Sequence, residues 1–198
     1  DTYIPFLFHR KYPARSFFWK VRLTGEMEAF AEQLQTKKGQ IDPKPRVAEI
    51  ARMTFAIRTL QPTDRHQWDV LWRGYLEFYE TTIPDHVTEL TWQRLMDPEA
   101  PILGFCAARE DGQLLGIVHY LFHPVTWAAG PRCYLEDLFT APEARGQGVA
   151  RALIEAVYGA ADARGADQVY WLTRDSNATA RRLYDQVARA TEFIKYRR

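Results

Sequence analysis

Little in this sequence points to a special environment. Two cysteines among 198 residues are too few for a disulfide-stapled fold, and neither has a second metal ligand at the spacing of a zinc site. We therefore expect Cys106 and Cys133 to be buried free thiols in a reducing compartment, with no metal bound. No apolar run approaches the roughly 20 residues that span a bilayer, and the first residues do not read as a secretory signal. These absences predict a cytoplasmic protein without a membrane partner.

The net charge is also small, +1 over the whole chain, so the overall charge gives no reason to expect nucleic acid as a partner. Its distribution is uneven. Residues 1–53 hold ten Lys+Arg against six Asp+Glu, and residues 54–198 hold 16 against 19. Basic and aromatic residues mix in the first 22 positions, which would suit an arm that binds nucleic acid or a partner, or a segment packed on the body. Because Met53 directly precedes the first strand pattern, we favour a packed segment or an N-terminal extension outside a functional domain of residues 54–198.

The hydrophobic pattern predicts an α/β domain with a mixed sheet. Antiparallel strands are expected at 54–60, 102–109, 114–122 and 133–140, with Asp111-Gly112 as a hairpin signal. Helical spacing follows an N-cap signal at Thr63-Asp64 and recurs within 85–96. The pattern then alternates between a helix over 149–161, a strand over 168–172, a helix over 177–187 and a last strand over 193–196. Strand, helix and strand in succession imply a parallel pair with a right-handed crossover.

Ligands of open sheets bind near the carboxyl ends of parallel strands, which places residues 138–140 and 172–175 at the site. The loop Arg145-Gly-Gln-Gly148 lies there, just before a helix. Glycine lets the backbone approach a ligand closely, and a helix start offers unpaired N–H groups to an anion. A Walker loop would need Lys-Ser/Thr after Gly148, and a dinucleotide fingerprint would need a glycine at Arg151. We therefore predict that this loop binds a phosphate beside the strand end that carries Glu136. The alternative is a turn without a ligand.

Three segments then carry a resemblance to one family. They are 134–140 (YLEDLFT), the loop pattern Arg145-x-x-Gly148-x-Ala150, and 177–184 (NATARRLY). Over residues 54–198 the chain resembles the GNAT superfamily of N-acetyltransferases. In detail it is similar to the polyamine (spermidine/spermine) acetyltransferases, which share YLED. It is also similar to the fungal-type histone and polyamine acetyltransferases, which share HPVTW at 123–127 as His-x-x-Thr-Trp and VYW at 169–171.

The resemblance implies a GNAT-type sheet, mostly antiparallel with a parallel strand pair at the cofactor site and flanked by helices. It also implies acetyl-coenzyme A (acetyl-CoA) as the acetyl donor. Backbone groups of Leu138, Phe139 and Thr140 would bind the pantetheine arm as an added strand does. N–H groups and the helix dipole would hold the pyrophosphate at a loop made of Arg145, Gly146, Gln147, Gly148, Val149 and Ala150. Asn177 would contact the cofactor near its thioester end.

The resemblance further implies two catalytic residues. Glu136 would serve, through water, as the general base that deprotonates an ammonium of pKa near 10, and Tyr184 would protonate the leaving thiolate. The residues themselves leave alternatives open. Glu136 could pair with Arg132 or Arg174, Tyr184 could be a core tyrosine, and Asn177 could be only an N-cap. In a regular strand Asp137 would face away from Glu136, so both enter one pocket only if the strand has a bulge.

Other polar residues are weaker candidates. In the family pattern the first two helices border the acceptor site, where a substrate could meet any of five side chains: Glu77, Glu80, Asp85, His86 and Glu89. Individually such residues are more often solvated surface groups. His119 and His123 are expected to be core or surface histidines rather than acid/base groups. After the last helix the family usually has Gly-Phe, whereas this chain has Ala188-Arg-Ala190, which leaves the register of the last strand open.

The leading functional hypothesis is an acetyl-CoA-dependent N-acetyltransferase that moves an acetyl group directly to a primary amine. The acidic body suits a cationic small molecule such as a polyamine as the acceptor. The alternative acceptors are an amino-acid or amino-sugar amine, an antibiotic, and a histone lysine, other protein lysine or protein N-terminus. The alternative classes of protein are a sensor that binds acyl-CoA without turnover and a protein that binds nucleic acid or a partner. The family resemblance also allows a homodimer, in which residues 193–196 could be exchanged between subunits.

Overall fold

The computed structural model describes residues 55–198. The predictions for residues 1–53, which include the basic aromatic arm and the domain boundary at Met53, lie outside the described residues. No helix within 55–198 is both long enough and apolar enough to cross a membrane.

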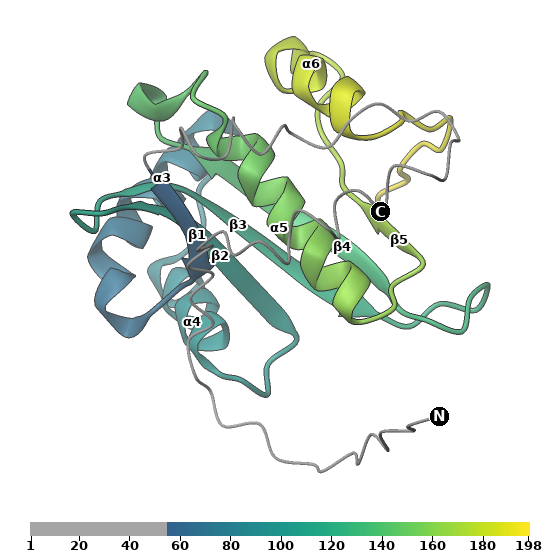
Figure 1. The fold of residues 1–198 in the computed structure, drawn as a ribbon, viewed down its shortest axis with the longest axis horizontal. Coiled ribbons are helices and arrows are strands. Elements are labelled where there is room, and N and C mark those ends of the chain that lie inside the picture. Colours follow the sequence, from purple (N-terminus) through teal and green to yellow (C-terminus); the bar gives the residue numbers. More distant parts are fainter. Residues whose placement is uncertain (1–54) are drawn as a thin grey trace, which may run out of the picture. The chain divides into compact units, whose positions relative to one another are not determined.

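A five-stranded mixed sheet forms the centre of the described region (Figure 1). Its strands follow sequence order and are β1 (Phe55–Thr59), β2 (Ile102–Arg109), β3 (Leu114–His123), β4 (Arg132–Thr140) and β5 (Gln168–Tyr170). The first four pair antiparallel, and β5 pairs parallel with β4. The predicted fold class is therefore confirmed. Gly112 has a φ of +86° in the β2–β3 turn, the left-handed conformation that made Asp111-Gly112 a hairpin signal.

Helices cover both faces of this sheet. They are α3 (Arg65–Phe78), α4 (Asp85–Met96), α5 (Val149–Ala163) and α6 (Ala178–Val187), with short 3-10 turns at Pro62–Asp64 and Pro142–Ala144. Gly116 of β3 lies against Val149 and Leu153 of α5. His119, an odd number of residues further along the same strand, lies against Trp68 of α3. Because strand residues alternate between faces, α5 covers one face and α3 the other.

The apolar stripes of α3 and α5 fill the core. Trp68, Leu71 and Trp72 are buried on α3, as their helical spacing predicted, and Leu153 and Val157 are fully buried on α5. Asp64 is the N-cap residue of α3, as predicted, but its side chain does not cap that helix. The Asp64 carboxylate accepts the Gln61 N–H at 2.8 Å and pairs with Arg58 at 2.6 Å, and it makes no cap bond to α3.

Strand β4 contains a β-bulge. Leu135 lies opposite Tyr120 and Asp137 lies opposite His119, so Glu136 is the extra residue. Residues that lie directly opposite share a face, and consecutive residues of β3 alternate. Leu135 and Asp137, two positions apart, therefore point to opposite faces. The prediction that Asp137 faces away from Glu136 assumed regular alternation of side chains. That alternation does not hold here, because the bulge inserts one residue.

The prediction of a last strand over residues 193–196 is wrong. No strand follows α6, and Phe193, Ile194 and Tyr196 are 82%, 73% and 88% exposed. These residues have strand-forming composition, but β-propensity reflects how well a side chain packs on a paired, half-buried surface. No described strand pairs with this segment, so composition alone does not make it a strand.

Candidate active site

A cleft of about 350 Å³ lies where β4, α5 and α6 meet. Its walls come from the ends of these elements and from the end of α3. The lining residues are Phe78, Tyr79, Leu138, Phe139, Thr140, Ala144, Arg145, Gly146, Gly148, Val149, Ala150, Arg151, Asn177, Thr179, Ala180 and Tyr184. Segments far apart in the sequence thus meet at one site, and ten of the twelve predicted site residues line it.

The loop between β4 and α5 has a backbone conformation that requires its glycines. Gly146 and Gly148 have φ values of +74° and +82°, a left-handed region that side chains disfavour. A Cβ built on Gly146 would meet nothing within 4 Å. Glycine is therefore favoured there by its positive φ and not by a lack of space. At the start of α5 the Ala152 N–H donates to the Gly148 carbonyl at 3.0 Å. The N–H groups that precede it are free of intrahelical partners.

Gln147 is the loop residue that does not line the cleft. Its side chain donates to the Glu143 carbonyl at 2.8 Å, which braces the loop from outside. Arg145 donates to the Thr140 carbonyl at 3.4 Å and lies over the Phe139 ring. The loop is therefore tied to the end of β4 at two points.

One edge of β4 is open beside the cleft. The strand pairs with β5 only over Arg132–Tyr134, so the backbone from Glu136 to Thr140 has no strand partner on that side. Figure 1 shows β5 continuing away toward α6. The Thr140 hydroxyl is buried and has no hydrogen-bond partner among residues 55–198. An unpaired strand edge and an unpartnered hydroxyl both fit an extended, polar ligand arm such as pantetheine.

Helix α6 contributes Asn177 and Tyr184. Asn177 is the N-cap, because its Oδ1 accepts the Ala180 N–H at 3.3 Å, and its Nδ2 donates to Thr173 at 3.1 Å. The N-cap alternative is thus confirmed, although the residue also lines the cleft. Tyr184 packs edge-on against Trp171 at 5.3 Å. Burial, with a smaller contribution from Tyr79, raises the pKa of the Tyr184 phenol to about 12.

Glu136 lies outside the lining of the cleft. Arg132 pairs with Asp167 and Arg174 with Glu80, so the two arginines considered as its partners are engaged elsewhere. Part of the Glu136 side chain is exposed. Even so, desolvation by surrounding protein atoms and then the charge of Asp137 raise the pKa of its carboxyl group. Such a shift makes a carboxylate a better proton acceptor near neutral pH.

The sequence did not single out Tyr79 as a site residue, and it gave Asp137 and His119 no role in the site. Tyr79 lines the cleft, with its ring 4.9 Å from Tyr75 and 5.3 Å from the Arg174 guanidinium. Asp137 bonds to the buried His119 at 3.0 Å. The helical stripe of α3 was correctly interpreted as core, and nothing in its spacing marks where the core ends and the cleft begins.

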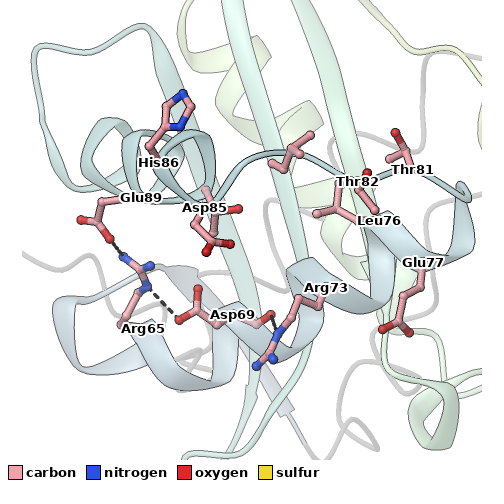
Figure 2. Close-up of a pocket in the computed structure, with 12 residues that line it drawn as sticks. Arg65, Asp69, Arg73, Leu76, Glu77, Thr81, Thr82, Asp85, His86 and Glu89 are labelled. Atoms are coloured by element: carbon pink, nitrogen blue, oxygen red, sulfur yellow. Dashed lines mark hydrogen bonds and ion pairs between the residues drawn. The ribbon is translucent and has the colours of Figure 1, made fainter.

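A second pocket, of about 750 Å³, lies between α3 and α4 (Figure 2). Four of the five weaker acceptor-site candidates line it, namely Glu77, Asp85, His86 and Glu89, whereas Glu80 does not. Arg65 bridges it through ion pairs with Asp69 at 2.9 Å and Glu89 at 2.7 Å, drawn as dashed lines in Figure 2. It shares no lining residue with the cleft at α5, so these candidates sit apart from it.

Over the described residues, no group of three or more His, Cys, Asp or Glu side chains is placed to hold a metal ion. Cys106 and Cys133 are both free and buried. Burial raises the pKa of the Cys133 thiol to about 11 and that of Cys106 to about 12. Both thiols are thus protonated at neutral pH and are poor nucleophiles.

Comparisons with known proteins agree with this geometry. The model of the acetyltransferase (GNAT) family matches residues 67–188. A D-amino-acid N-acetyltransferase, HPA3, of Saccharomyces cerevisiae is 37% identical over 145 residues, which cover 73% of this chain and 90% of that protein.

Solved structures share the fold at lower identity. The aminoglycoside N-acetyltransferase AAC(6')-Iy, crystallised with CoA, has a TM-score of 0.63 at 21% identity and covers 73% of this chain and 93% of its own. A ribosomal-protein-alanine N-acetyltransferase from Brucella melitensis has a TM-score of 0.58 at 23% identity, with coverage of 72% and 96%. From the family match and the yeast relative together, we conclude that this chain belongs to the acetyltransferase (GNAT) family.

Proposed function

We propose that this protein is an acetyl-CoA-dependent N-acetyltransferase that acts on the primary amine of a small molecule. The observation that carries the proposal is the cleft at α5. There an open edge of β4, a left-handed glycine loop before a helix N-terminus, and the half-buried Tyr184 line one cavity. An extended ligand with an anionic end and a reactive thioester end matches these three features in that order.

Binding of the donor would use backbone groups. The N–H groups at the start of α5 and in the Arg145–Gly148 loop would donate hydrogen bonds to the pyrophosphate, assisted by the helix dipole. The open edge over Leu138–Thr140 would pair with the amides of the pantetheine arm, and Thr140 would gain a partner for its buried hydroxyl. Bound acetyl-CoA would supply a thioester carbonyl as the electrophile.

Glu136 would act as the general base of the reaction. An alkyl ammonium has a pKa near 10 and must lose a proton before its nitrogen can attack. The pKa of Glu136 is raised, so its carboxylate is a stronger base than that of an ordinary glutamate. The carboxylate stays ionised at any pH above this raised pKa. Because Glu136 does not line the cleft itself, proton transfer would run through water, as general bases often do.

Tyr184 would act as the general acid. Its pKa of about 12 keeps the phenol protonated at neutral pH, so it can give a proton to a departing thiolate whose thiol has a pKa of about 8.5. The proton balance then closes. The ammonium gives its first proton through water to Glu136, which passes it to solvent, and the free amine then forms the C–N bond. As the C–S bond breaks, the nitrogen loses its second proton to solvent, Tyr184 gives one to sulfur, and Tyr184 is reprotonated from solvent, so one proton is released per turnover.

Two acceptor classes have support. A D-amino acid is favoured by the yeast relative. Arg174 lies over the ring of Tyr79, which lines the cleft, and it could exchange its long ion pair with the exposed Glu80 for the carboxylate of such a substrate. A polyamine is favoured by the two adjacent carboxylates of Glu136 and Asp137, which would attract a second ammonium. We place the D-amino acid first because it draws on a whole-domain similarity and not only on local charge.

The test is release of free thiol from acetyl-CoA with a panel of amines. D-amino acids, their L-enantiomers as matched controls, spermidine, and a lysine peptide form the panel. Thiol release that depends on a small-molecule amine supports the proposal, and enantiomer preference separates the two acceptor classes. Release with the peptide alone would move the function to protein acetylation. Tight CoA binding without release for any amine would make the protein a sensor.

A further inference from the structure

His119 occupies an unusual position for a histidine. It lies in the middle of β3 with only 1% of its side chain exposed. Its Nε2 is 3.0 Å from the Trp68 indole nitrogen, and its Nδ1 is 3.0 Å from a carboxylate oxygen of Asp137. The Trp72 ring also lies 5.4 Å from the imidazole. Both ring nitrogens are therefore engaged, one by α3 and one by β4.

These partners determine where the proton sits. An indole N–H can only donate, so Nε2 of His119 must accept and carries no proton. The single ring proton is then on Nδ1, which donates it to Asp137. A doubly protonated ring would set two N–H groups against each other at 3.0 Å. His119 is thus a fixed neutral donor, and it is not an acid/base group of the reaction.

Asp137 also interacts with Tyr75 of α3. Burial raises the pKa of Tyr75 most strongly, and its interactions with Asp137 raise that pKa further. The imidazole of His119 is the hydrogen-bond donor to the Asp137 carboxylate oxygens, and the phenol of Tyr75 belongs to their electrostatic environment. The Asp137 side chain is 14% exposed, so little water competes for these oxygens. Trp68, His119, Asp137 and Tyr75 form one network that joins α3, β3 and β4.

The bulge connects this network to Glu136. In a regular strand the two carboxylates would lie on opposite faces. Here Glu136 is the extra residue next to Asp137, and it acts electrostatically on tyrosines of the α3 face. The titratable groups that interact with Glu136 are Asp137 and Tyr134 on β4, His119 on β3, Tyr75 on α3, Tyr170 on β5 and Lys195 near the C-terminus.

We propose that His119 is a positioning residue that acts through Asp137. Trp68 holds His119 as its Nδ1–H tautomer, and the hydrogen bond from Nδ1 fixes the Asp137 carboxylate beside the bulged Glu136. Asp137 then keeps a negative charge next to the base, which strengthens Glu136 as a proton acceptor. The role of Glu136 as base rests on the proposed function, whereas the tautomer and the hydrogen bonds do not.

The first test needs no turnover. Nitrogen-15 NMR of histidine-labelled protein at pH 7, with the His119 signals assigned by their loss in His119→Gln, reports which ring nitrogen carries a proton. We expect a protonated Nδ1 and an unprotonated Nε2. Two protonated nitrogens, or a proton on Nε2, would overturn the proposal whatever the enzyme assay shows.

The second test uses a matched pair of variants and the pH profile of kcat/KM. His119→Asn keeps an amide N–H near the position of Nδ1, whereas His119→Gln keeps a polar group near Nε2 and loses the donor to Asp137. We expect His119→Gln to lower kcat/KM about tenfold and to move the acidic limb to lower pH by about half a unit, because a less fixed neighbouring charge raises the pKa of Glu136 less. His119→Asn should keep the limb in place.

Asp137→Asn provides the third arm, since it removes the charge and can keep an oxygen that accepts from His119. It should move the limb in the same direction as His119→Gln. If the acidic limb stays fixed in Asp137→Asn and in His119→Gln, or if the asparagine and glutamine variants of His119 lose equal activity, His119 serves packing only and the proposal fails. A wild-type enzyme that releases no thiol with any amine would instead refute the proposed function, and the NMR test would remain decisive for the network.

Discussion

Replacement of Ala150 by glutamate tests the pyrophosphate end of the cleft most directly. Ala150 lines the cleft and lies in the first turn of α5, where a helical backbone accepts any side chain without the strain that Gly148 would impose. A carboxylate in the first turn of a helix is compatible with the helix dipole and should not destabilise the fold. The new charge would, however, compete for the N–H groups that we assign to the pyrophosphate.

The expected magnitude follows from Coulomb's law. Two unit charges about 5 Å apart repel by about 3 kcal/mol at an effective dielectric constant of about 20. The loop glycines are exposed, so the site is open to solvent, and screening should leave about 1 to 2 kcal/mol. At about 1.4 kcal/mol per factor of ten, Ala150→Glu should weaken CoA binding by about 5- to 30-fold.

Isothermal titration calorimetry with CoA measures this loss, and Gly159→Glu is the matched control. Gly159 lies on the same helix with open space around its Cβ position, about 14 Å further along the axis, which is beyond the Debye length of about 10 Å at 0.1 M salt. The control should keep native affinity. Native affinity in Ala150→Glu, or an equal loss in both variants, would show that the start of α5 does not bind the pyrophosphate.

Three further predictions concern the acid, a buried ion pair and a backbone contact. Tyr184→Phe should lower kcat by about 10²-fold, the lower range for a general acid, with unchanged Kd for CoA; an unchanged kcat would remove the assignment. Burial alone would raise the pKa of Asp64, but its bonds to Arg58 and the Gln61 N–H, with the Arg58 charge, lower it. Asp64→Asn should therefore cost about 2 to 3 kcal/mol in urea unfolding at pH 7. That cost should disappear as the pH falls through the lowered pKa, and a cost that persists there would argue against the ion pair. A Cβ on Gly130 would lie 2.1 Å from a backbone oxygen, so Gly130→Ala should lower Tm, whereas Gly159→Ala should raise stability by about 0.5 to 1 kcal/mol; equal Tm values would contradict the contact.

The order of elements followed well from local sequence because each element has a strong local signal. Helical spacing marked Trp68, Leu71 and Trp72 as a buried stripe, and Asp111-Gly112 marked a hairpin. The exception is the C-terminal segment. Its apolar residues predicted a strand by composition, but a strand exists only where a neighbouring strand offers hydrogen bonds. The presence of such a neighbour is a tertiary fact that composition does not contain.

The cleft was largely predictable for a related reason. The backbone conformations that form the cleft favour particular residues. Left-handed turns favour glycine, as at 146 and 148, and a helix start favours an N-cap residue such as Asn177. The family resemblance supplied the roles of Tyr184 and Glu136, which remain predictions. Gln147 was assigned to the binding loop through its backbone N–H, which remains a prediction, and its side chain bonds to the Glu143 carbonyl outside the cleft.

The environment of Glu136 could not be predicted, because a bulge has no reliable sequence signal and reverses every conclusion drawn from alternation. Regular alternation predicted that Glu136 and Asp137 lie on opposite faces, and it predicted only a packing role for His119. With one inserted residue, strict alternation no longer separates Glu136 from Asp137, and the buried His119 is the donor that holds Asp137. A bulge costs ladder hydrogen bonds, so it persists only where other contacts stabilise it. The bond from His119, itself fixed by Trp68, is a contact of that kind, and loss of its Nδ1 donor should therefore disturb the base before it disturbs the fold.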